Sequence, residues 1–235
     1  MSELIFVRHG QASFGKAAYD KLSDCGLEQV RILAQHWHEI GEQFDCIYSG
    51  TLLRQRETAD ELLSLVKGQP RQAVENPSLN EYNGDALIQA LLHSHAEEWL
   101  NPVPRWPVDD PKLFQQLFEV ATAKWLTNEL QPLTDDARFE YWVGFQHRVH
   151  SVIDEIMQRH RDGSRVLIST SGGVIALALQ RVLQFPDEQV ISTNWMVHNS
   201  SVTRVKYGNG KLSLIQFNNI AHLERAELQH MITYR

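Results

Sequence analysis

Cysteine is scarce in this 235-residue sequence: there are two, Cys25 and Cys46, and no Cys-x-x-Cys pair. Two cysteines cannot build a disulfide framework, and without the pair the usual signature of zinc or thiol redox chemistry is missing. No stretch approaches the roughly 18 to 20 apolar residues of a membrane-spanning helix, and the N-terminal apolar run is too short for a signal peptide. We therefore expect a cytoplasmic chain with no membrane segment and no metal site.

An excess of basic charge is also missing. The 22 basic and 29 acidic residues give a formal net charge of -7. A surface with this balance does not favour nucleic acid or acidic membranes as partners. There are no repeats or low-complexity segments, and 43% of the residues are hydrophobic, so we predict one folded domain over residues 1–235.

Short apolar runs alternate with helical patterns along most of the chain. Helices are expected from about residues 27, 52 and 174, and Gly208-Asn209-Gly210 predicts a hairpin between the last two strands. This order predicts an α/β fold: a doubly wound, mostly parallel sheet of about six strands with helices on both faces and an antiparallel C-terminal edge. The predicted strands are 4–7, 46–48, 73–74, 166–168, 202–205 and 212–215.

The middle of the chain, from about residue 85 to 161, carries no strand pattern. Its helical stretches are 86–92, 113–130 and 139–160, and a proline-rich break lies over 101–107. We predict a helical insertion folded onto the sheet domain, because no linker separates it from the rest. Its tryptophans are expected to lie mostly in the core or at an interface.

Arg8-His9-Gly10 follows directly on the first predicted strand. Ligands of open α/β sheets bind at the carboxyl ends of the strands. A histidine there can act as a nucleophile or an acid–base group, and an arginine can bind two oxygens of a phosphate. Taken alone, these three residues fit a merely basic strand end better than a catalytic site.

Three further segments change that balance: residues 49–59 (SGTLLRQRETA), 78–84 (SLNEYNG) and 166–175 (VLISTSGGVI). In this order, and together with Arg8-His9-Gly10, they resemble the histidine phosphatase superfamily, also called phosphoglycerate mutase-like. Residues 22–29 resemble the family's stretch after the first motif. The resemblance spans residues 3–84 and 164–223. It leaves out the helical middle, which varies in that family and shapes the substrate mouth.

The resemblance implies a mechanism. His9 matches the family's nucleophile, which becomes phosphorylated, and no cofactor is implied because a neutral imidazole can attack phosphorus without a metal. Arg8 and Arg54 match two phosphate-binding arginines, whose charge stabilises the transferring group. Glu81 matches the general acid that protonates the leaving oxygen.

Two of these residues also have simpler interpretations. Arg54 and Glu57 have the spacing of a solvent-exposed ion pair on a helix. Ser78 and Glu81 have the spacing of a capping box, although this requires a helix to run through the turn-favouring pair Asn83-Gly84.

The chain departs from the family at two positions. Ser171 stands where the family usually carries its second histidine; it can cap the following helix and donate one hydrogen bond, but it carries no charge. Backbone N–H groups after Gly172 are expected to offset part of that loss. Gly15 stands where the family commonly has an asparagine. Four other histidines were weighed as substitutes, and each is more simply a surface or core residue: His93, His95, His198 and His222.

These residues predict a metal-independent phosphatase acting through a phosphohistidine on His9, weakened by Ser171, on a small phosphoester or a phosphoprotein. One alternative is a turnover-deficient regulatory protein that keeps Arg8 and Arg54 as an anion pocket. A mutase is less favoured, because mutases of this type retain both histidines. A nucleotide-binding protein using Ser171-Gly172-Gly173 is weakly supported, because neither phosphate-loop consensus is present.

Overall fold

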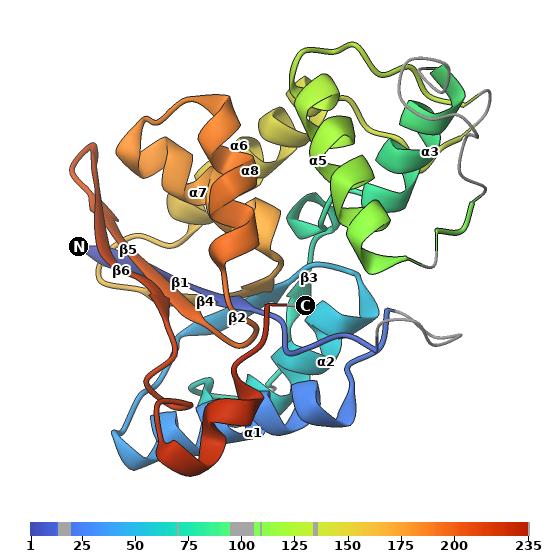
Figure 1. Ribbon diagram of the computed structural model, residues 1–235. Helices are drawn as coiled ribbons and strands as arrows, with labels where there is room; N and C mark the ends of the chain where they lie inside the picture. Colours follow the sequence, from blue (N-terminus) through green and yellow to red (C-terminus); the bar gives the residue numbers. More distant parts are fainter. Residues whose placement is uncertain (14–19, 70, 95–105, 109, 134–135, 235) are drawn as a thin grey trace. The chain divides into compact units, whose positions relative to one another are not determined.

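The computed structural model describes residues 1–13, 20–69, 71–94, 106–108, 110–133 and 136–234 (Figure 1). The chain divides into two compact units, one of Met1–Glu81 with Val149–Arg235 and one of Tyr82–Arg148. The second unit occupies much of the stretch predicted as a helical insertion from about 85 to 161. That the whole chain forms one domain stays a prediction.

The first unit is built on a six-stranded sheet with the order β3-β2-β4-β1-β5-β6. β4 runs parallel to β1 and β2, and β3 is parallel to β2, whereas β5 is antiparallel to both β1 and β6. The predicted mostly parallel sheet with an antiparallel C-terminal edge is therefore confirmed. Its strands are β1 (Ser2–Arg8), β2 (Cys46–Ser49), β3 (Val74–Glu75), β4 (Arg165–Thr170), β5 (Val202–Gly208) and β6 (Lys211–Asn219).

The hairpin between β5 and β6 turns through Asn209 and Gly210, whose φ angles are 53° and 72°. Positive φ at both central residues is the requirement of the tight turn that matches the twist of antiparallel strands, and asparagine followed by glycine meets it at low cost. The hairpin predicted from these residues is confirmed.

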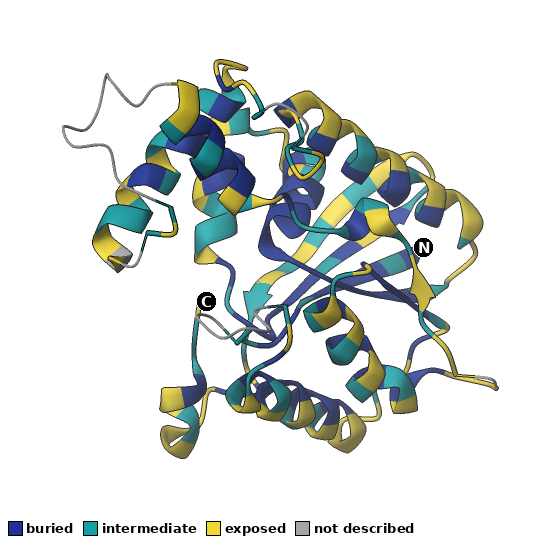
Figure 2. Cartoon of the chain, turned by 90° about the vertical axis from the view of Figure 1, so that its right-hand side faces the viewer, coloured by how far each residue is buried: buried dark blue, intermediate teal, exposed yellow. Residues whose placement is uncertain are grey.

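Helices cover both faces of the sheet (Figure 1). α1 (Asp24–Glu39) and α2 (Leu53–Leu62) share a buried apolar cluster with one face, and α7 (Gly172–Leu183) contacts β1 and β6. Figure 2 shows the consequence: the central strands are almost wholly buried, whereas α1 is buried along one side and exposed along the other. Continuous apolar runs such as Leu4–Val7 are expected where both faces of a strand are covered.

Two helical details differ from the prediction. The helix expected over 52–66 ends earlier, at Leu62, and continues as a 3-10 turn over Leu63–Leu65. α8 (Asp187–Met196) was not predicted at all. Only Val190 and Ile191 are buried in it, so it lacks the regular apolar stripe by which a helix is recognised in sequence. Two further 3-10 segments are Pro77–Leu79 and Ala226–Met231.

The second unit is helical, as predicted for this stretch. It contains α3 (Gly84–Ser94), α5 (Pro111–Leu126) and the start of α6 (Trp142–Arg159). Trp125 and Trp142 are buried, with ring centroids 5.1 Å apart. These two tryptophans thus form core, as expected of them.

Candidate active site

β1 and β4 bring the first and last motifs together. Arg8 pairs with Thr170 in the parallel register, so His9 and Ser171 leave the sheet side by side. The His9 backbone N–H donates to the Thr170 carbonyl at 2.9 Å. Gly10 then passes so close to α1 that a Cβ atom there would lie 2.2 Å from the Gly26 carbonyl oxygen. Glycine is therefore required where the chain leaves β1.

The His9 ring is held as one tautomer. Its Nδ1 lies 2.7 Å from the Gly10 carbonyl oxygen, which can only accept, so Nδ1 carries the proton. Its Nε2 accepts from the Arg54 Nε–H at 3.1 Å. The arrangement leaves a lone pair on Nε2, at the side where the guanidinium lies, and a lone pair is what a nucleophile needs.

The surroundings of His9 keep it neutral. Burial lowers its pKa well below the usual 6.5, and the positive charges of Arg54 and Arg8 lower that pKa further. Each of these causes disfavours the imidazolium form. Only 6% of the residue is exposed. The ring is therefore in its nucleophilic protonation state at neutral pH.

Arg54 lies in the first turn of α2, with its side chain 12% exposed. The alternative of an ion pair with Glu57 is wrong: Glu57 accepts from the Leu22 backbone N–H, and Arg54 pairs with Asp20. The second Asp20 oxygen accepts from the Leu53 N–H at the start of α2, at 2.7 Å. Asp20 thus holds both a cation and a helix N-terminus, two groups that bind phosphate in other proteins.

Replacing Asp20 by asparagine is expected to tighten the binding of inorganic phosphate about two- to fivefold. The reason is that Asp20 competes with the ligand for Arg54 and for the N–H group of Leu53, through a half-exposed ion pair of modest strength. The measurement is the competitive inhibition constant of phosphate. Asp24→Asn removes the same charge from an exposed position in α1 and serves as the control. Weaker binding in Asp20→Asn would show instead that Asp20 holds Arg54 in its binding position.

Arg8 lies at the end of β1 and is half-buried. Its Nη1 donates to the Val197 carbonyl, and its backbone carbonyl accepts from the Ser200 N–H at 3.0 Å. Asn199 Nδ2 donates to the His9 carbonyl at 3.2 Å. The turn before β5 therefore braces the backbone of the Arg-His pair.

Glu81 reaches the same edge of the sheet from another segment. Its Oε2 accepts from the Gly173 N–H, in the first turn of α7, at 2.9 Å. The capping-box alternative is wrong, because the 3-10 turn of Pro77–Leu79 is capped by Asn76 and α3 starts only at Gly84. Glu81 is thereby tied to the first turn of α7, two residues after Ser171.

Ser171 and Gly172 start α7. Ser171 occupies the N-cap position, as predicted, but its hydroxyl makes no capping bond and instead accepts from Gln55 Nε2 at 2.8 Å. At Gly172, a Cβ atom would lie 2.1 Å from Asn194 Oδ1. One backbone N–H expected to offset the missing histidine, that of Gly173, is already bonded to Glu81.

The other histidines lie elsewhere in the described chain. His198 is hydrogen-bonded to Asn218 and stacks near Tyr234, and His93 is exposed on α3. His222 is buried and hydrogen-bonded to Ser200 at 2.8 Å, and burial lowers its pKa to about 3. His95 and Gly15 fall outside the described residues. None of the three described histidines has a contact with His9.

Sequence reasoning missed two polar residues at this edge, Asp20 and Gln55. Asp20 carried no signal, since it belongs to no motif. Gln55 lies inside the 49–59 motif directly after Arg54, and its complete burial was the feature that the sequence alone does not display.

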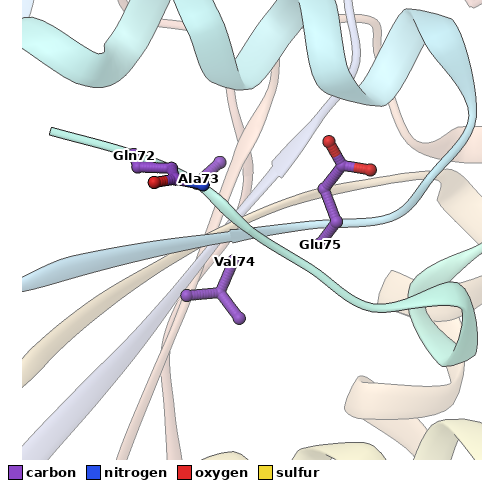
Figure 3. A pocket seen from close by; sticks show the side chains of 4 residues that line it. All are labelled: Gln72, Ala73, Val74 and Glu75. Atoms are coloured by element: carbon purple, nitrogen blue, oxygen red, sulfur yellow. The ribbon is translucent and has the colours of Figure 1, made fainter.

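Figure 3 shows a hollow beside the edge strand β3, lined by Gln72, Ala73, Val74 and Glu75. It contains none of the predicted site residues. Within the described ranges, no group of three or more histidine, cysteine or acidic side chains is arranged to hold a metal ion. No described helix combines the length and the apolar character needed to span a bilayer.

Comparisons with known proteins agree with this architecture. The family described as "Histidine phosphatase superfamily (branch 1)" matches residues 4–114 and 112–220. A 2,3-bisphosphoglycerate-dependent phosphoglycerate mutase of Parvibaculum lavamentivorans is 24% identical over 198 residues, which are 81% of this chain and 84% of the mutase.

Two phosphatases are also similar. The mitochondrial serine/threonine-protein phosphatase Pgam5 of Drosophila ananassae is 25% identical over 202 residues, which are 85% of this chain but only 56% of that protein. A crystal structure of a phosphoserine phosphatase variant from Entamoeba histolytica, in complex with phosphoserine, has a TM-score of 0.62 at 17% identity. The match covers 95% of this chain and all of the other. At that identity the likeness shows a shared fold.

Proposed function

Because the chain belongs to the histidine phosphatase superfamily, we propose that it is a metal-independent phosphatase that hydrolyses phosphoric monoesters through a phosphohistidine on His9. The observation that carries this proposal is the state of His9. The ring is neutral, its Nδ1–H is bonded to the Gly10 carbonyl, and its Nε2 lone pair faces the Arg54 guanidinium. Nucleophile and phosphate-binding cation are thus already adjacent.

In the first step, the His9 Nε2 lone pair attacks phosphorus while the bond from phosphorus to the ester oxygen breaks. The imidazole gains positive charge, which the Gly10 carbonyl stabilises through the Nδ1–H bond. Arg54 and Arg8 balance the negative charge on the equatorial phosphoryl oxygens. Glu81 gives its proton to the leaving oxygen, so the alcohol departs neutral.

In the second step, water attacks the phosphohistidine. The Glu81 carboxylate takes the proton that the water loses, the bond from phosphorus to Nε2 breaks, and phosphate and neutral His9 are restored. Both steps use only groups at one edge of the sheet.

The proposed substrate is a small phosphorylated molecule or a phosphoprotein. Support for the first comes from the structural neighbour that binds phosphoserine, and support for the second from the similar serine/threonine-protein phosphatase. A mutase is a weaker candidate although one relative is named as such, since Ser171 carries no charge where mutases of this type keep a histidine.

The test is hydrolysis of a chromogenic aryl phosphate by the pure protein, with and without a chelator. We expect the same turnover in both, because the charge that a metal would supply comes from Arg8 and Arg54. Loss of turnover in the chelator, restored by added metal, would contradict the metal-independent mechanism. Absence of turnover together with binding of phosphate or vanadate would favour the regulatory phosphate-binding alternative.

A further inference from the structure

Gln55 is a fully buried amide directly beside the predicted phosphate-binding edge. It lies in the first turns of α2, and none of it is exposed. Its Nε2 donates to the Ser171 hydroxyl oxygen at 2.8 Å and to the Leu79 carbonyl at 3.2 Å. Its Oε1 has no donor within hydrogen-bond distance among the described residues. A buried carbonyl oxygen without a donor is costly and calls for an explanation.

The orientation of this amide follows from its partners. If the amide were turned over, Oε1 would face the Leu79 carbonyl, and two acceptors would oppose each other. The fold also makes room for the amide: a Cβ atom on Gly50 would lie 1.9 Å from Oε1. Glycine at position 50 is thus needed for Gln55 to occupy this place.

The consequence falls on the proton of Ser171. A hydroxyl group can donate one hydrogen bond, and Nε2 of Gln55 cannot accept it. No described residue supplies an acceptor for it either. Ser171 is nearly fully buried and leaves the sheet next to His9. Its hydroxyl is therefore held with an oxygen lone pair engaged and a proton to give, next to the nucleophile.

We propose that Gln55 is a positioning residue that commits the Ser171 hydroxyl to donating a hydrogen bond to the phosphoryl group. The pair would supply, without charge, the hydrogen bond that the family's second histidine supplies elsewhere. This inference rests on the proposed phosphatase function, and it explains why a buried carbonyl oxygen without a donor is retained.

The test is a double-mutant cycle of Gln55→Leu and Ser171→Ala. Each single variant is expected to lower kcat on an aryl phosphate about tenfold, the usual loss of a hydrogen bond to a charged group, with a smaller change in KM. Because Gln55 acts through Ser171, the double variant is expected to be no slower than Ser171→Ala alone. Multiplied losses, or an unchanged kcat in Gln55→Leu, would overturn the proposal.

Two further variants make the cycle robust. Gly50→Ala should displace the Gln55 amide and cause a similar loss, again only when Ser171 is present, which matters if Gln55→Leu does not fold. Arg56→Gln is the matched control: the neighbouring residue is exposed and paired with Glu75, so turnover should not change.

The same cycle separates this proposal from the proposed function. If the wild-type protein does not turn over any phosphoester, the phosphatase proposal fails, and the four proteins are then compared by their affinity for orthovanadate. A roughly tenfold weaker affinity in both single variants, with no further loss in the double, would still support the Gln55–Ser171 pair. Unchanged or multiplied affinities would overturn it.

Discussion

His9→Ala is expected to lower kcat on any phosphoester by on the order of 10⁴-fold or more, because no other group can form the covalent intermediate. The pocket cations and Glu81 remain in this variant, so binding of phosphate should survive while turnover does not. The measurement is steady-state turnover beside a direct binding assay, in a protein shown to melt as the wild type does.

His93→Ala is a suitable control, since that histidine is exposed on α3. Turnover near the wild-type rate in His9→Ala would remove the nucleophile assignment. A trapped phosphoenzyme in the wild type and none in the variant would support it further.

The pH dependence gives an independent view of the same residue. His9 is the base form when deprotonated, and its pKa lies well below 6.5. Its contribution to kcat/KM should therefore stay constant as the pH falls through 6.5 and should decline only near the depressed pKa. A fall in kcat/KM centred at 6.5 that is assigned to His9 would mean that the ring is solvated in the working enzyme.

Glu81→Gln is expected to separate substrates by their leaving group. For an alkyl phosphate such as phosphoserine the loss in kcat should be about 10²- to 10⁴-fold, because an alkoxide leaves poorly without a proton. For an aryl phosphate with a stable phenolate the loss should be much smaller. The measurement is the ratio of the two rates in wild type and variant.

Glu75→Gln is the control for this pair of substrates, since that carboxylate is exposed and paired with Arg56. Equal losses on both substrates would indicate that Glu81 acts only by holding the start of α7 through the Gly173 N–H. The Gln variant keeps an acceptor oxygen for that bond, so a purely structural role predicts little loss on either substrate.

The local parts of the fold were predictable because their causes are local. The apolar run Leu4–Val7 and the turn residues Asn209 and Gly210 have the periodicity and the φ preference of the elements that they form. The candidate site was predictable only as a set of motifs. That Arg8 and Thr170 pair, and so place His9 beside Ser171, depends on a parallel register between distant strands.

The sequence by itself therefore determined the α/β alternation, the hairpin at the sheet edge and the motif residues His9, Arg8, Arg54 and Glu81. Only the tertiary structure decided the partners of the polar groups around them. Asp20 meets Arg54 across 34 positions and Gln55 meets Ser171 across 116. An amide or a carboxylate has no sequence preference for a particular distant partner. The pairing is selected when the sheet register and the start of α2 bring the groups into a buried place where each must be satisfied.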